Sequence, residues 1–248
     1  MPRTDSSSPA SPALDPTRVK VIACATVMEE MAPRMPAEMP RQVLDFGLHL
    51  HPNSLTAELQ AAIDDSPDLD AVLLGYGLCS RAVVGLRATH CRLVLPKVDD
   101  CIAIFLGSRG EYERQVRGEP GTYYLTKGWI EVGDSPFDEV DRLAETYGPE
   151  RATRMIGLMF RNYSRVALID TGSQDLERYR AYARAAAERF GLRFEEIPGS
   201  PELVEKLLTG PWDEDFVIVE RGGVVRYEAF MRFRPGAAST ASGPAHAG

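Results

Sequence analysis

Short apolar runs alternate along the chain with longer segments whose apolar residues recur every three or four positions. The runs are rich in Val, Ile and Leu and too short for helices, so they predict buried strands; they cover residues 18–25, 71–74, 92–95, 166–170, 193–197 and 216–220. The longer segments predict helices at residues 55–64, 80–88, 137–147, 150–163, 176–190 and 201–208, and one that starts near Cys101. This alternation predicts an α/β fold with a mostly parallel sheet flanked by helices, built from successive β–α units.

Two segments do not fit either pattern clearly. Residues 43–50 predict a further extended piece, which contains His49. Residues 121–130 read GTYYLTKGWI and lie between turn signals, which favours a loop or a hairpin strand. Its aromatic residues Tyr123, Tyr124 and Trp129 are expected to cover an edge of the sheet, although a packed hairpin accounts for them equally well.

The two ends of the chain differ from the middle in composition. Residues 1–16 are rich in Ser and Pro and predict a disordered leader, and residues 235–248 predict a disordered tail. The folded part is therefore expected over residues 17–234, either as one α/β domain or as two lobes over 17–130 and 131–234. The leader lacks the apolar core of a signal peptide, so we expect a cytoplasmic protein with reduced cysteines.

Charge and hydropathy exclude two classes of partner. The formal net charge is −8, which argues against nucleic acid as a partner, because nucleic-acid binders normally carry a basic face. No apolar run approaches the roughly 20 residues that span a membrane. We therefore expect neither nucleic acid nor a membrane as a partner.

Three of the four cysteines follow predicted strands. Cys24 ends the first strand directly, and Cys79 and Cys101 come within a few residues of the next two. Because ligands bind at the carboxyl edge of an open parallel sheet, we expect these thiols to converge there. Cys91 opens a strand instead and should lie at the opposite edge.

Three convergent thiols predict a metal site or an iron–sulfur cluster with one open coordination position. At a cluster iron that position binds a substrate as a Lewis acid, and at zinc it activates water or a thiol. The spacing is unlike a zinc knuckle, and free cysteines are also common as small buried apolar residues. The residues alone leave both interpretations open.

Other candidates come from the same sheet edge. His49 is a candidate fourth ligand or proton donor, and Asp100 a candidate base, although an acidic residue before a helix also serves as an N-cap. Tyr123 is a candidate catalytic residue. Candidate substrate-binding residues are Tyr76 in the GYG turn, Tyr124, Trp129, and the IDTG residues Asp170 and Thr171.

Six short motifs resemble the domain-of-unknown-function family sixteen thirty-eight of bacterial and archaeal proteins. They are IAC at 22–24, GLH at 47–49, LGYGLC at 74–79, DDCIAIFLGS at 99–108, GTYYLTKGW at 121–129 and LIDTG at 168–172. The resemblance implies that Cys24, Cys79, Cys101 and His49 match the residues that carry the family pattern, whereas Cys91 does not. It also implies a setting near corrinoid methyltransferase systems.

These observations lead to three hypotheses. The first is an enzyme, a lyase or transferase, that holds a 4Fe–4S cluster through the three cysteines and acts on a small anionic molecule. The second is a zinc-thiolate enzyme that transfers a methyl group or activates a thiol. The third is a non-catalytic protein that handles a metal or a corrinoid.

Overall fold

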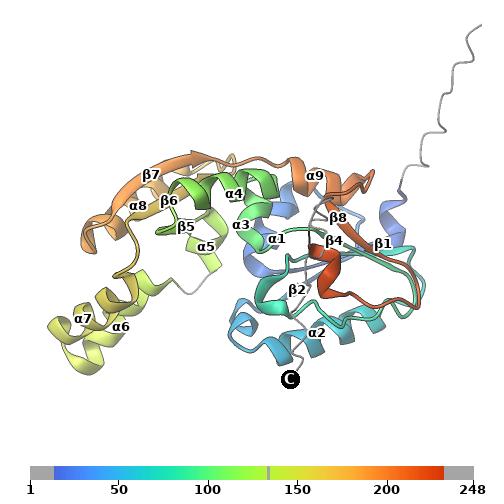
Figure 1. Ribbon diagram of the computed structural model, residues 1–248, viewed down its shortest axis with the longest axis horizontal. Helices are drawn as coiled ribbons and strands as arrows, with labels where there is room; N and C mark the ends of the chain where they lie inside the picture. The colour runs from blue at the N-terminus through green and yellow to red at the C-terminus, as the bar shows by residue number, and fades with distance from the viewer. Residues whose placement is uncertain (1–13, 133–134, 232–248) are drawn as a thin grey trace, which may run out of the picture.

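The computed structural model describes residues 14–132 and 135–231 as two sheets with helices around them (Figure 1). The first sheet has the order β2 (Arg41–Leu44), β1 (Val19–Cys24), β3 (Ala71–Gly75), β4 (Arg92–Pro96) and β8 (Phe216–Val219). Its strands pair in parallel except β8, which is antiparallel to β4. The second sheet, β5 (Thr122–Leu125), β6 (Arg165–Asp170) and β7 (Arg193–Pro198), is wholly parallel. The predicted α/β class with mostly parallel strands is confirmed.

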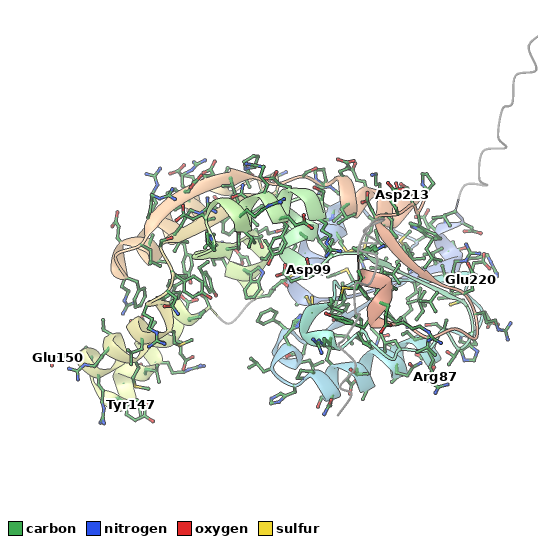
Figure 2. All side chains as sticks on the ribbon, viewed as in Figure 1. Arg87, Asp99, Tyr147, Glu150, Asp213 and Glu220 are labelled. Carbon is green, nitrogen blue, oxygen red and sulfur yellow. The ribbon has the colours of Figure 1, made fainter. Side chains whose placement is uncertain are left out.

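The helices mostly follow the predicted pattern. They are α1 (Ala25–Met31), α2 (Pro52–Asp64), α3 (Cys101–Phe105), α4 (Arg109–Gly118), α5 (Lys127–Val132), α6 (Pro136–Tyr147), α7 (Pro149–Phe160), α8 (Leu176–Arg189) and α9 (Glu202–Thr209). Short 3₁₀ segments are η1 (Pro16–Arg18), η2 (Ala32–Arg34), η3 (Phe46–Leu50), η4 (Cys79–Arg81) and η5 (Tyr227–Phe230). The α6–α7 hairpin extends away from the first sheet, with Tyr147 and Glu150 at its tip (Figure 2).

The chain leaves the first sheet and later returns to it. Strand β8 completes the first sheet after β5, β6 and β7 have formed the second one. A division into lobes over 17–130 and 131–234 is therefore wrong, because β5 belongs with the later strands and β8 with the earlier ones. Ala167 and Ile169 of β6 and Ile197 of β7 also belong to the apolar cluster of the first sheet. The two sheets thus share one core, and a second cluster fills the space under α6, α7 and α8.

Helices α1 and α5 join the two parts at close range. Gly128 of α5 lies against the backbone of Thr26 of α1, and a Cβ added at Gly128 would stand 2.5 Å from the Thr26 carbonyl oxygen. Because no real Cβ approaches an oxygen so closely, only glycine permits this approach. The contact places the next residue, Trp129, beside the first sheet.

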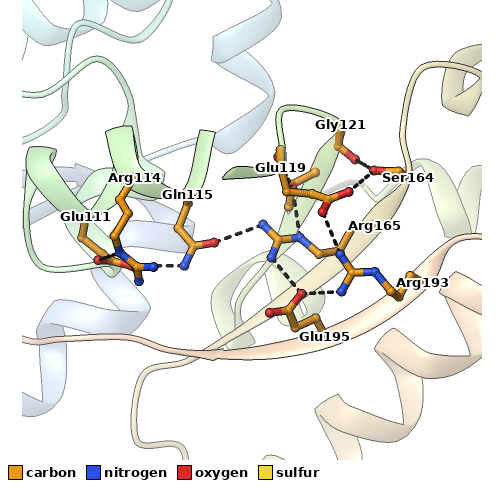
Figure 3. A network of polar contacts seen from close by, with 10 residues as sticks. Glu111, Arg114, Gln115, Glu119, Gly121, Ser164, Arg165, Arg193 and Glu195 are labelled. Atoms are coloured by element: carbon orange, nitrogen blue, oxygen red, sulfur yellow. Dashed lines mark hydrogen bonds and ion pairs between the residues drawn. The ribbon is translucent and has the colours of Figure 1, made fainter. Parts of the chain in front are cut away.

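A buried arginine ties together the amino-terminal end of the second sheet (Figure 3). Arg165 is 4% exposed and donates hydrogen bonds to Thr122 Oγ1 (2.9 Å), Gln115 Oε1 (3.1 Å) and Glu195 Oε2 (2.9 Å). Arg193 shares Glu195, with 2.6 Å between Nη1 and Oε2. The network links β5, β6, β7 and α4, and it leaves the guanidinium of Arg165 paired despite its burial.

Three local predictions are wrong and one helix was not predicted, and backbone conformation explains most of these differences. Residues 80–88 do not form a helix, because Arg81 and Gly85 take positive φ angles of 63° and 94°. Residues 43–50 are not one extended piece, because Asp45 accepts a hydrogen bond from Gly47 N and starts η3. Residues 121–130 form the parallel strand β5 and helix α5 rather than a hairpin. Helix α4 was not predicted.

Some expectations fall on residues that the structure does not describe. The predicted tail lies outside the described residues, and so does the predicted leader apart from residues 14–16. Within residues 14–132 and 135–231, none of the helices is both long and apolar enough to cross a membrane.

We predict that Gly128→Ala destabilises the protein by about 1–3 kcal/mol, because the added methyl group forces α5 away from Thr26. The measurement is the free energy of unfolding in urea. Gly157→Ala in α7 is the matched control, because a Cβ there meets no atom within 4 Å. It should stabilise the protein by about 0.5–1 kcal/mol, as alanine for glycine does within a helix. Equal effects of the two substitutions would contradict the assigned role of the α1–α5 contact.

Candidate functional site

Three thiols lie together at the carboxyl edge of the first sheet. Cys24 ends β1, Cys79 lies in η4 after β3, and Cys101 begins α3 after β4. The side chain of Cys101 is hydrogen-bonded to that of Cys79. Cys24 is close enough to interact electrostatically with each of them. Cys91, which precedes β4, lies at the other edge, near Asp70 and Arg221. The structure thus brings together the three cysteines that follow strands.

The surroundings shift the pKa values of the three thiols in different directions. The hydrogen bond between Cys79 and Cys101 lowers the pKa of the Cys79 thiol and raises the pKa of the Cys101 thiol well above its usual value. Burial raises the pKa of the Cys24 thiol, against a hydrogen bond with Thr26 Oγ1 at 3.1 Å. Cys79 is also the only one of these three that is partly exposed. It is therefore the thiol most ready to act as a thiolate and the easiest to reach from solvent.

An aromatic group of four side chains lies beside the thiols. Tyr76 is 1% exposed, and burial raises the pKa of its hydroxyl, with a smaller contribution from the three nearby cysteines. The His49 ring packs edge-on at 5.9 Å from Tyr76, centroid to centroid, and at 5.4 Å from Phe46. Phe46 in turn packs 4.8 Å from the Trp129 ring. We call Phe46, His49, Tyr76 and Trp129 the aromatic group.

Three polar atoms of the aromatic group are buried without a partner. Among the described residues, His49 Nδ1, Tyr76 Oη and Trp129 Nε1 make no hydrogen bond. A buried polar group without a partner costs about 1–3 kcal/mol, and folded proteins contain few of them. Their concentration beside three thiols leaves unused hydrogen-bonding capacity at this edge of the sheet. The residues present therefore fit a bound cofactor or ligand at this edge.

Asp100 has the structural role that its position before a helix suggested. Its Oδ1 accepts a hydrogen bond from Ile102 N (2.9 Å), and its Oδ2 accepts one from the Tyr112 hydroxyl (2.8 Å). Burial raises the pKa of its carboxyl group. The ring of Tyr124 lies 6.5 Å from that of Tyr112, so Tyr124 is at this side of the site.

Three predicted site residues lie elsewhere. Tyr123 packs against Phe137 and Phe160 in the second cluster, so the prediction that it belongs to the thiol site is wrong. Successive side chains of a strand point to opposite faces, and Tyr124 takes the face toward the thiols. Asp170 ends β6 in the second sheet. Thr171 follows it and lines a cleft whose wall contains none of the three cysteines.

Sequence reasoning missed Phe46 and Tyr112. Phe46 lies in the 3₁₀ turn that was read as extended, and Tyr112 lies in the helix that was not predicted. The Asp45–Gly47 pair, an aspartate two residues before a glycine, is the signal that would have indicated the turn.

The thiols are not arranged for a single ion. In the part of the chain that the structure describes, no group of three or more His, Cys, Asp or Glu side chains is placed so that it could hold one metal ion. A cluster differs from a single ion, because each thiolate binds a different iron atom and the sulfurs stand further apart.

Comparisons with known proteins give a family but no characterised relative. No curated protein and no solved structure matches the sequence. The family model described as Protein of unknown function (DUF1638) matches residues 43–208, a range that includes His49, Cys79 and Cys101 but not Cys24. The match covers more than half of the chain, and this protein therefore belongs to the DUF1638 family.

Proposed function

We propose that Cys24, Cys79 and Cys101 hold a 4Fe–4S cluster with one open iron, and that the protein is an enzyme acting on a small anionic molecule there. The observation that carries the proposal is the meeting of three thiols with three buried polar atoms that lack partners. When bound, such a cluster supplies a Lewis acid at its open iron.

The protein's own groups have separate roles in this proposal. The Tyr76 hydroxyl and the Trp129 indole N–H are donors, which suits an anionic molecule rich in hydrogen-bond acceptors. His49 is a neutral ring near pH 7, because burial lowers its pKa, and it holds its one N–H proton at Nδ1 or Nε2. Phe46 holds His49 and Trp129 in place and excludes water from one side. Asp100 orients α3, and through α3 the thiol of Cys101.

The set of available ligands, and not the distance between Cys79 and Cys101, favours a cluster over zinc as the occupant. A single zinc ion needs its thiolates within one coordination sphere, with each sulfur about 2.3 Å from the metal. The arrangement of the described side chains does not offer that set. The zinc-thiolate enzyme is therefore our second hypothesis, and a non-catalytic protein that handles a metal or a corrinoid is the third.

We predict that protein produced and purified without oxygen contains about four iron atoms and four acid-labile sulfides per chain. Cys24→Ala, Cys79→Ala and Cys101→Ala should each lose most of the iron and the visible absorbance, because each removes one ligand. Cys91→Ala is the matched control and should keep both, since Cys91 lies at the other edge. Iron and sulfide analysis of the four variants is the measurement. Equal retention in all four would reject the site, and zinc in place of iron would favour the second hypothesis.

We also predict that His49 makes folding stability depend on pH in the acidic range. Its folded-state pKa is lowered, so below about pH 6.5 the unfolded chain takes up a proton here that the folded chain does not. Stability is lost as pH falls from that value to the lowered pKa. Urea unfolding at about pH 7.5 and about pH 5.5 should show a smaller loss for His49→Gln than for the unmodified protein. Identical losses would contradict a neutral, buried His49.

A further inference from the structure

The outer face of helix α7 exposes a group of large apolar side chains. The inner face of this helix is buried in the second apolar cluster. Three residues of the outer face have exposed fractions of 41%, 62% and 58%: Met155, Leu158 and Met159. Spacings of three and four residues place them side by side on the helix. No other helix in the described part of the chain exposes more than one large apolar side chain.

Three arginines border this apolar face. Arg151 and Arg154 lie within one turn before it, and Arg161 follows the end of the helix. All three are exposed, and none of them forms an ion pair or a side-chain hydrogen bond within residues 14–132 and 135–231. The neighbouring helices differ, since Arg189 of α8 pairs with Asp141 of α6 at 2.7 Å. The positive charges of α7 are therefore available to an anionic surface outside the chain.

Two of these arginines also line a hollow at the tip of the α6–α7 hairpin. It has a volume of about 680 Å³, and its wall includes Tyr147, Glu150, Arg151 and Arg154. The hairpin extends away from the first sheet and ends at Tyr147 and Glu150 (Figures 1 and 2). A flat surface can therefore approach α7 without meeting the rest of the protein. An arginine-lined hollow beside exposed apolar side chains suits a phosphate headgroup at the boundary of a lipid bilayer.

Charge and side-chain chemistry favour a bilayer over other occupants. Antiparallel packing of α7 against a second copy would bring Arg154 close to Arg161 of that copy, and like charges repel. An acidic protein with a fixed shape would have to hold long, flexible methionine and arginine side chains in one conformation, which costs entropy. A fluid anionic surface accepts these side chains in many conformations. Apolar residues of such helices enter the boundary between headgroups and acyl chains, while basic residues attract the lipid phosphates.

We propose that α7 is a docking surface for an anionic phospholipid bilayer. Met155, Leu158 and Met159 enter the headgroup boundary, and the arginines beside them contact lipid phosphates. The net charge of the chain is −8, so the rest of the surface is repelled by anionic lipid and the protein meets the bilayer through this face. The expectation of no membrane partner rested on the absence of a spanning segment, which a helix lying in the interface does not need.

Sedimentation of the full chain with lipid vesicles at about 0.15 M salt tests this. Vesicles made of equal parts of phosphatidylglycerol and phosphatidylcholine should carry the protein into the pellet, and pure phosphatidylcholine should bind it at least about fivefold more weakly. Raising the salt to about 1 M should release most of the protein, because the Debye length falls from about 8 Å to about 3 Å. Glycerol phosphate at the same phosphate concentration should not displace it, because it offers no apolar boundary.

Variants connect the binding to α7. Leu158→Gln should weaken vesicle binding by about tenfold, because a large apolar side chain is no longer buried there. Arg154→Gln should weaken it by about fivefold, because one positive charge near the surface is lost. Leu50→Gln and Arg41→Gln are the matched controls, since both side chains are exposed and lie outside the hairpin, and they should bind as the unmodified protein does. All four positions are exposed, so the substitutions spare the fold.

Three results would overturn the proposal. In the first, the protein stays in the supernatant with anionic vesicles, which would leave the face to an acidic protein. In the second, pure phosphatidylcholine binds equally well or glycerol phosphate displaces the protein. In the third, the two α7 variants bind as well as the two controls. Analytical ultracentrifugation tests the remaining occupant, because a dimer that Leu158→Gln dissociates would assign the face to a second copy and also overturn the proposal.

Discussion

Parallel pairing of β1, β3 and β4 is the constraint on which the candidate site depends. Because their registers align, each strand delivers its carboxyl end to the same edge, and the residues that follow meet there although 77 positions separate Cys24 from Cys101. No local motif could place them together. The tight turn at Gly77 contributes, since a Cβ there would stand 3.0 Å from the Val98 carbonyl oxygen. This approach brings the loop after β3 against the loop after β4, so the Cys79 and Cys101 side chains can interact.

The second constraint is the close contact of α1 with α5. Helix α1 begins directly after Cys24, and its other end supplies Glu29 and Glu30 to the cleft at β6. Helix α5 carries Trp129 toward the thiols and Lys127 toward the cleft. The same pair of helices therefore contributes to the thiol site and to the cleft. A change in the packing at Gly128 would displace residues at the thiol site and at the cleft, because neither helix has room to shift independently.

The sequence predicted most strands, the fold class and the convergence of Cys24, Cys79 and Cys101, because these follow from period and topology. It did not predict which face of β5 meets the site. Tyr123 and Tyr124 are identical residues next to one another. Packing against Phe137 and Phe160 places Tyr123 on the face of β5 that points away from the thiols. It did not predict η4 either, because Arg81 adopts a positive φ angle that arginine rarely takes. The placement of β5 in the second sheet and of β8 in the first also depends on long-range strand pairing, which the periodicity of the sequence does not reveal.

The unpartnered polar atoms of the aromatic group lower the stability of the folded state. Three buried polar groups without partners together cost several kcal/mol, a large share of the 5–15 kcal/mol by which a typical domain is stable. The shared apolar core of the two sheets has to offset that cost when nothing is bound. A ligand that accepts from Tyr76 and Trp129 removes it, so its binding is coupled to stability by mass action.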